Sequence, residues 1–152
     1  MKKNFLFLLA LSLFSFSVNL AVAATRADAE AMVKKAIELF KTKGKDGALA
    51  AISDPKGEFI KGDLYAFVIK MDGTCIAHPA NAKLINKDLH PLKDTDGKQF
   101  MLEMTNSVKA KPDGTWTTYN WTNPETKKIQ KKSSYTVKVP GEEMYVGCGV
   151  YE

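Results

Sequence analysis

Three side chains in this sequence could bind a small polar ligand through ring and hydrogen-bonding groups. His78 ends an extended segment before Pro79, and its imidazole could donate to a carboxylate. Tyr119 and Trp121 are two residues apart, so they share one face of a strand. Rings that carry an O–H or N–H suit the wall of a small-ligand pocket. Two structural alternatives stay open, because His78 could bond only to loop backbone and the aromatic pair could simply fill a core.

Catalytic and metal-binding motifs find no match in the sequence. It has no Gly-x-Ser-x-Gly nucleophile motif and no phosphate-binding glycine loop. Cys75-Ile76-Ala77-His78 lacks the second cysteine of a c-type haem motif, and the histidines and cysteines have no metal-ligand spacing. Asp94-Thr95-Asp96-Gly97 resembles the start of a calcium loop, but Thr105 stands where the final glutamate belongs. We expect no enzyme activity, no metal and no cofactor, and we expect Asp96 to cap the following helix or position its loop.

Helical patterns occupy the segment that follows the first 24 residues. Thr25 can cap a helix with Asp28 in its first turn, and apolar residues then recur at three- and four-residue steps as far as Phe40. Gly44 is expected to end this helix. A short second helix is predicted over about residues 47–52, before Ser53-Asp54-Pro55.

From Leu64 the hydrophobic pattern changes to that of strands. Residues 65–71 are apolar on both faces and predict a central strand, and Asp72-Gly73 predicts a hairpin turn. A structured loop over residues 79–93 precedes a helix over about residues 99–109. The remaining strands are predicted at residues 74–78, 115–121, 129–139 and 144–151. This order predicts an α+β fold, a five-stranded antiparallel sheet with the N-terminal helix on one face and the loop–helix insertion on the other.

The first 23 residues are typical of a secretory signal peptide. Lys2 and Lys3 form a basic start, residues 5–14 are apolar except for Ser12, and Ala21-Val22-Ala23 provides small residues for cleavage. Removing residues 1–23 leaves a single domain over residues 24–152. We expect this domain to be periplasmic or secreted, without membrane insertion after cleavage.

The charge of the chain does not indicate a nucleic-acid partner. The 22 basic and 17 acidic residues give a net charge of +5. Without Lys2 and Lys3 the balance is 20 against 17, or +3, spread along the chain. Nucleic-acid binding needs a concentrated basic face, so we expect no such partner.

Short motifs from Asp63 to Tyr151 occur in a specific order. They are Asp63-Leu64-Tyr65-Ala66-Phe67-Val68, Asp72-Gly73, Ala77-His78-Pro79, Asp94-Thr95-Asp96-Gly97, residues 114–119 with Trp121, Pro124, Lys132-Ser133-Ser134-Tyr135 and Val146-Gly147-Cys148-Gly149-Val150-Tyr151. In this order they resemble the single Cache (sCache) family of extracytoplasmic sensor domains. The resemblance implies a PAS-like sheet whose five strands, numbered along the chain, lie in the order 2-1-5-4-3. It also implies a small metabolite, often a short carboxylate, bound between the sheet and the inserted loops.

The same resemblance suggests which residues contact that ligand. Lys132 is the candidate partner for a carboxylate, and Tyr135 is the polar residue of the same motif. Residues three apart face opposite sides of a regular strand, so both can reach the ligand only through a bulge or a strand start. A solvated Lys132 is the alternative, and His90 is interpreted as a loop residue. The full predicted ligand-binding set is His78, Tyr119, Trp121, Lys132, Tyr135, Tyr65, Phe67 and Gly147.

Two features depart from the family pattern. Family members usually continue into membrane spans, whereas this sequence ends at Glu152, so we expect a membrane receptor or histidine kinase as its signalling partner. Met144 replaces a usual aromatic residue and is expected to alter the packing of the pocket wall or the core. Asn86 replaces a common glycine and can adopt a left-handed backbone.

Two functional hypotheses follow. In the first, the chain is a monomeric periplasmic sensor that binds a short organic acid and reports occupancy to a membrane partner. In the second, it is a structural or adaptor protein on the same fold with a vestigial pocket. Convergence of Lys132, His78, Tyr119 and Trp121 on one concavity distinguishes the first hypothesis from the second.

The two cysteines are predicted to be reduced thiols. The strand order implied by the family places one strand between Cys75 and Cys148. Two strand spacings are about 9.6 Å, beyond the limit of about 7 Å between bridged Cα atoms. Alternation also places Cys148 with Met144, Val146 and Val150 on the face toward the N-terminal helix.

Overall fold

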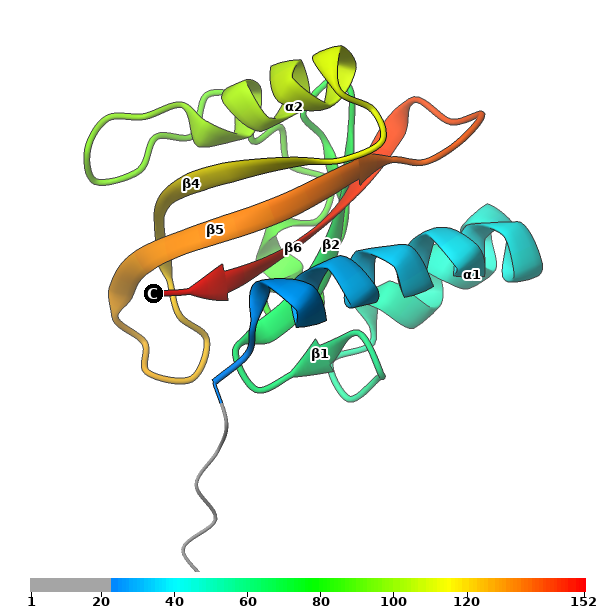
Figure 1. The fold of residues 1–152 in the computed structure, drawn as a ribbon, viewed down its shortest axis with the longest axis horizontal. Coiled ribbons are helices and arrows are strands. Elements are labelled where there is room, and N and C mark those ends of the chain that lie inside the picture. Colours follow the sequence, from blue (N-terminus) through cyan, green and yellow to red (C-terminus); the bar gives the residue numbers. More distant parts are fainter. Residues whose placement is uncertain (1–22) are drawn as a thin grey trace, which may run out of the picture.

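The computed structural model describes residues 23–152, which form an antiparallel sheet with one helix packed on each face (Figure 1). The predicted signal peptide falls on residues 1–22 and Ala23, so nearly all of it lies outside the described residues. The α+β layout predicted from the sequence is confirmed.

The N-terminal helix α1 (Arg26–Ser53) begins at the predicted cap and has a kink at Gly44, where the sequence predicted its end. The Thr25 hydroxyl accepts a hydrogen bond from the Asp28 amide (3.2 Å), and the Asp28 carboxylate accepts one from the Thr25 amide (2.8 Å). This reciprocal cap satisfies two amides that helix geometry leaves free. Gly44 has a left-handed φ of +68°, so the two predicted helices form one element with a kink.

The sheet has the strand order that the resemblance implies. Its strands are β1 (Ile60–Lys61), β2 (Leu64–Lys70), β3 (Cys75–Ala77), β4 (Thr115–Thr122), β5 (Ile129–Lys138) and β6 (Met144–Tyr151). They lie in the order β1-β2-β6-β5-β4, with β3 also paired to β2, and all pairs are antiparallel. The five predicted strands are confirmed, and β1 is an addition, since two residues show no hydrophobic period.

The insertion between β3 and β4 holds a short 3-10 helix, η1 (Ala82–Leu84), and α2 (Phe100–Ala110). Asn86 has a φ of +65°, so it adopts the left-handed backbone expected there. The Asp94 carboxylate accepts hydrogen bonds from the amides of Lys98 (2.9 Å) and Asn120 (3.0 Å). Asp96 accepts one from the Asn120 side chain (2.8 Å), and α2 begins without a side-chain cap. Of the two predicted roles, Asp96 therefore positions the loop against β4.

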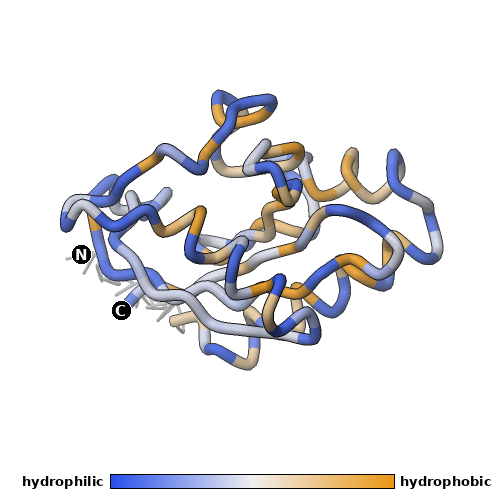
Figure 2. The backbone as a smooth tube through the Cα atoms, turned by 90° about the horizontal axis from the view of Figure 1, so that it is seen from above, coloured by the Kyte–Doolittle hydropathy of each residue, from blue (hydrophilic) through white to orange (hydrophobic). Residues whose placement is uncertain are grey.

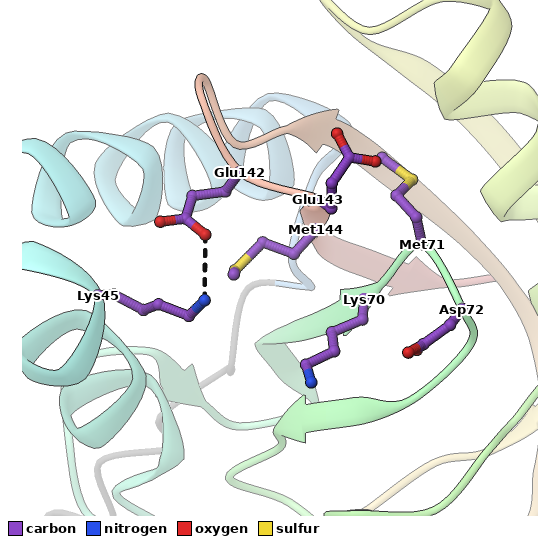
Figure 3. A pocket seen from close by; sticks show the side chains of 7 residues that line it. All are labelled: Lys45, Lys70, Met71, Asp72, Glu142, Glu143 and Met144. Atoms are coloured by element: carbon purple, nitrogen blue, oxygen red, sulfur yellow. Dashed lines mark hydrogen bonds and ion pairs between the residues drawn. The ribbon is translucent and has the colours of Figure 1, made fainter.

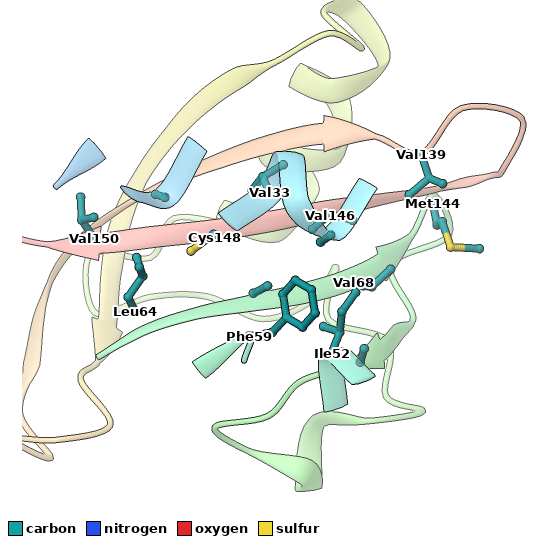
Figure 4. Packing of buried hydrophobic residues seen from close by; sticks show 14 residues of the cluster. Val33, Ile52, Phe59, Leu64, Val68, Val139, Met144, Val146, Cys148 and Val150 are labelled. Atoms are coloured by element: carbon teal, nitrogen blue, oxygen red, sulfur yellow. The ribbon is translucent and has the colours of Figure 1, made fainter. Parts of the chain in front are cut away.

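Hydrophobic residues form a separate core on each face of the sheet. The core beside α1 includes Val33, Phe59, Val68, Met144 and Val146 (Figure 4). Met144 is therefore part of this core, so its replacement of an aromatic residue affects core packing. The second core lies under α2. Both helices alternate between hydrophobic and hydrophilic residues along the chain, as elements with one buried face do (Figure 2).

Cys75 and Cys148 are both unpaired and buried, as predicted. Cys75 belongs to the core under α2, and Cys148 belongs to the core beside α1, where its sulfur lies 3.6 Å from that of Met32. The sheet therefore separates the two thiols.

Candidate ligand-binding site

A small internal cavity lies between the sheet and the β3–β4 insertion. Its volume is about 10 Å³, which is about the space one water molecule needs. Five of the predicted site residues line it, and these are Tyr65, Phe67, His78, Tyr119 and Trp121. Aliphatic and aromatic side chains of the insertion complete the wall, namely Leu84, Leu89, Phe100 and Met101, with Ile69 from β2. The sheet and the insertion thus bring together most of the set predicted from the sequence.

A larger cleft of about 330 Å³ opens from this region toward the surface. The β3–β4 insertion contributes Ala80 and Asn81 to one wall, and the β4–β5 turn contributes Thr122, Pro124 and Lys127 to the other. Tyr65, His78 and Trp121 line both the cleft and the internal cavity. These three side chains therefore form the boundary between the cleft and the cavity.

His78 is held in a defined orientation and is only 5% exposed. Its Nδ1 accepts a hydrogen bond from the backbone amide of Asn81 (3.0 Å). In the neutral imidazole the ring proton is therefore on Nε2, which can donate. Burial, aided by the charge of Lys132, lowers the pKa of His78 to about 3, so the ring is neutral near pH 7. His78 thus bonds to loop backbone and also lines the cavity, and its contact with a ligand stays a prediction.

The aromatic residues of β4 are packed and oriented by their neighbours. The ring of Tyr119 stacks on Phe100, with 4.3 Å between centroids, and Trp121 meets the same ring edge-on at 5.3 Å. The Tyr119 hydroxyl shares a hydrogen bond with Ser134 (2.9 Å). Trp116 lies on the opposite face, under the guanidinium of Arg26 (4.7 Å). The aromatic wall is therefore packed directly against α2 through Phe100.

Lys132 is fully buried, which contradicts the solvated alternative. Its Nζ lies 3.7 Å from the centroid of the Tyr65 ring and 4.9 Å from that of Tyr151. Within residues 23–152, it and the Thr117 hydroxyl are the buried side-chain polar atoms that have no hydrogen-bond partner. Burial lowers the pKa of Lys132 to about 7. The Tyr65 ring contacts this amine and lines both the cavity and the cleft, whereas Lys132 lines neither. Of the four residues predicted to converge on one concavity, the structure therefore brings His78, Tyr119 and Trp121 together there, and Lys132 is not among them.

Two glycines of β6 make space for these side chains. A Cβ atom on Gly147 would overlap the ring of Phe67. A Cβ atom on Gly149 would lie 2.6 Å from Cε of Lys132 and would also overlap the Ser134 hydroxyl. The predicted residue Gly147 therefore supports the cavity wall from beneath, and Gly149 allows the lysine side chain to lie against β6.

Tyr135 does not join this cluster. The pairing of β4 with β5 is regular from Thr115 to Thr122, so the bulge that would turn Lys132 and Tyr135 to one face is absent in this segment. The ring of Tyr135 lies instead on the α1 face beside Trp116, with 5.3 Å between centroids, and its hydroxyl donates to the carbonyl of Asp113 (3.2 Å). The structure therefore places Tyr135 outside the candidate site.

Two polar residues of the site were missed by the sequence analysis. Ser134 bonds to Tyr119, and the Tyr151 hydroxyl lies 3.4 Å from that of Tyr65 and donates to the carbonyl of Thr122. Strand alternation could have identified both residues. Ser134 is two positions from Lys132 and Tyr151 is four positions from Gly147, so each shares a strand face with a predicted site residue. By the same alternation, Tyr135 faces away from Lys132 and lies outside the site.

A second hollow of about 470 Å³ lies at the other end of the molecule, between α1 and the turns that follow β2 and β5 (Figure 3). Its acidic side chains already have partners, because Glu142 pairs with Lys45 (3.1 Å), Glu143 pairs with Lys138 (2.9 Å), and Asp72 accepts a hydrogen bond from the Thr74 amide (2.9 Å). No group of three or more histidine, cysteine or acidic residues in the described part of the chain could hold a metal ion. The cavity under α2 is therefore the best candidate site.

Comparison with known proteins identifies the family. The family model of single Cache domain 2 matches residues 20–152. This chain belongs to the single Cache domain 2 family. A crystal structure of a methyl-accepting chemotaxis protein from Vibrio parahaemolyticus covers 82% of the chain with a TM-score of 0.70 and 18% identity, and 86% of that structure is matched. A Cache chemosensory domain described for carboxylic acid recognition covers 80% with a TM-score of 0.64 and 26% identity, over 84% of its length.

A curated relative, the methyl-accepting chemotaxis protein McpP of Pseudomonas putida, is 30% identical over 89 residues. The alignment spans 59% of this Cache chain and 16% of that relative. Within residues 23–152, no helix is both long and apolar enough to cross a membrane. The family and its structural neighbours support a role as a ligand-binding sensor domain.

Proposed function

We propose that this Cache domain is an exported sensor that binds a short monocarboxylate between the sheet and the β3–β4 insertion. Cleavage after Ala23 would release it into the periplasm or the medium. Occupancy of the site would then be passed to a membrane signalling partner, either a receptor or a histidine kinase. The observation that carries the proposal is the buried ammonium of Lys132, which has no hydrogen-bond acceptor among residues 23–152.

A carboxylate is the ligand that best complements this arrangement. An unpaired buried charge costs several kcal/mol, and an adjacent anion offsets that cost. The Nε2–H of His78 supplies a second donor on the boundary between the cavity and the cleft. The internal cavity has room for about one water molecule, so an acid would occupy it only after the Tyr65 ring moves, and a short acid needs the smaller rearrangement. Entry requires displacement of the Tyr65 ring, which lies over the amine.

The lining residues also argue against an amino acid. An α-ammonium group needs a carboxylate or several acceptors when it leaves water. No acidic side chain lines either the cavity or the cleft. Asp63, the acidic residue whose charge acts on Lys132, accepts a hydrogen bond from Asn123 (3.0 Å). The similarity to a domain described for carboxylic acid recognition supports the same choice.

Isothermal titration with acetate, propionate, alanine and arginine tests the proposal. We expect the two acids to bind and the two amino acids to give no heat. Lys132→Met should weaken acid binding by roughly 2–5 kcal/mol, because the anion then lacks its buried partner. Lys131→Met, at an exposed position of the same strand, is the matched control and should bind as the native protein does.

Trp121→Ala should weaken binding less, through loss of the shape of the wall. Binding that is unchanged in Lys132→Met removes this lysine from the site and indicates an uncharged or cationic ligand. A folded protein that binds none of these compounds favours the adaptor hypothesis.

A further inference from the structure

The amine of Lys132 has little to stabilise its charged form. Tyr65 and Tyr151 present ring faces to it, and no atom in the described part of the chain accepts a hydrogen bond from it. Ring faces attract a cation, but by less than the hydration that a fully buried ammonium loses. Gly149 leaves room for the side chain against β6, so the buried position follows from the fold.

The groups that face Lys132 from the surrounding elements do not titrate near neutral pH. Burial raises the pKa values of Tyr65 on β2, Tyr119 on β4 and Tyr151 on β6. Burial also raises the pKa of Cys148, on the far side of β6, to about 12. His78, from the loop after β3, is neutral because burial lowers its pKa to about 3. Asp63 is the acidic group that acts on the amine, and no ion pair joins the two within the described residues.

Lys132 itself changes charge in this range. Its pKa of about 7, set by burial, means that the amine is mostly neutral in mildly alkaline solution without an anion beside it. A carboxylate placed next to it favours the ammonium form and raises that pKa. We infer that capture of a carboxylate beside Lys132 takes up one proton from solvent, so that this sensor responds to the acid and to external pH together. This inference rests on the proposed function.

The direction of the effect follows from linkage. The amine gains a proton from water and becomes an ammonium, and no covalent bond to the ligand forms. Binding is therefore independent of pH well below about 7, where the amine is already protonated. Above about pH 7, the affinity falls about tenfold for each pH unit, until the pH reaches the raised pKa of the complex.

Calorimetry with propionate in two buffers of different ionisation enthalpy measures the proton uptake directly. We expect near-zero uptake at about pH 6 and close to one proton per site at about pH 8.5, with affinity about 30-fold weaker at the higher pH. Lys131→Met should retain this behaviour. His90→Gln should also retain it, because His90 bonds to Thr105 (3.0 Å) and has no role in the site. Lys132→Arg keeps a permanent charge, so any acid that it binds should enter without proton uptake.

Three results would overturn the inference, and they differ in what they imply for the function. Propionate binding with no proton uptake at either pH removes the coupling and leaves the proposed function intact. Uptake that disappears in His90→Gln assigns the proton to His90 and also removes the coupling. Absence of binding at every pH removes the proposed function and the coupling together.

Discussion

At the scale of single residues, Lys132 lowers the stability of the fold and is also the proposed partner of the ligand. A fully buried amine without an acceptor lowers the stability of the fold, because its charged form loses hydration. In the proposed function, the same unpaired group is the partner of the bound anion. Functional sites commonly keep such locally unfavourable groups, since activity depends on them.

Lys132→Met should therefore stabilise the protein. Methionine keeps the length of the side chain without its amine, and we expect a gain of about 1–3 kcal/mol in the free energy of unfolding at about pH 6. The folded pKa of about 7 lies below the usual value of 10.5, so the unfolded chain binds more protons between these values and the native protein gains stability as pH rises. The advantage of the variant should shrink accordingly between about pH 7 and pH 10.

Urea unfolding of both proteins at about pH 6 and pH 9.5 measures this difference. Lys131→Met serves as the exposed control and should change stability by less than about 0.5 kcal/mol. A Lys132→Met protein that is less stable at both pH values contradicts the argument, because the amine would then make a favourable contact in the fold.

At the scale of secondary-structure elements, β5 and β6 build the polar part of the site by alternation. Lys132 and Ser134 point to the α2 face from β5, and Gly147, Gly149 and Tyr151 lie on the same face of β6. Because these glycines have no side chain, the larger side chains of Phe67 from β2 and Lys132 from β5 can lie across β6. The site therefore depends on where side chains are absent as well as on where they are present.

Gly149→Ala tests this dependence. The added methyl would meet Cε of Lys132 and the carbonyl of Ser133, at 2.6 and 2.9 Å, so the lysine must move. We expect a loss of about 1–3 kcal/mol in unfolding free energy and weaker acid binding. Part of the stability loss should be relieved in the double variant with Lys132→Ala, where the side chain no longer crosses residue 149. Equal losses with and without Lys132→Ala would show that the two residues do not interact.

The sequence predicted the positions of these elements better than it predicted which of their side chains form the site. The central strand β2 and the antiparallel order are set by local periodicity, turn residues and the family pattern, and both are confirmed. Gly44 interrupts the helix where its end was predicted, but the two predicted helices form one kinked element. Strand β1 was missed, because a two-residue strand has no period to detect. Tyr135 was predicted as a site residue from a motif, although it is three positions from Lys132 and so faces the opposite side of a regular strand. The regular pairing of β4 with β5 shows that the two side chains do point to opposite faces. The position of Lys132 behind Tyr65 depends on tertiary packing, which no local pattern encodes.

At the scale of the whole molecule, the candidate site is close to the end where α1 begins and β6 finishes (Figure 1). Tyr151 contacts both Lys132 and Tyr65, and the next residue, Glu152, forms an ion pair with Arg26 (3.8 Å) at the start of α1. A ligand that displaces Tyr65 or Lys132 would therefore act on residues next to both described ends of the domain.

The sheet also divides the molecule into two cores, and this division predicts the state of the cysteines. Cys75 and Cys148 lie in different cores on strands separated by β2, and burial raises both thiol pKa values to about 12. We expect two titratable thiols in the denatured, non-reduced protein and almost no thiol reaction in the folded protein at neutral pH, because the thiolate is the reactive form. Cys148→Ser should reduce the denatured count to one. A count of zero in the native sequence would require a disulfide, and hence a strand order or register different from the one described.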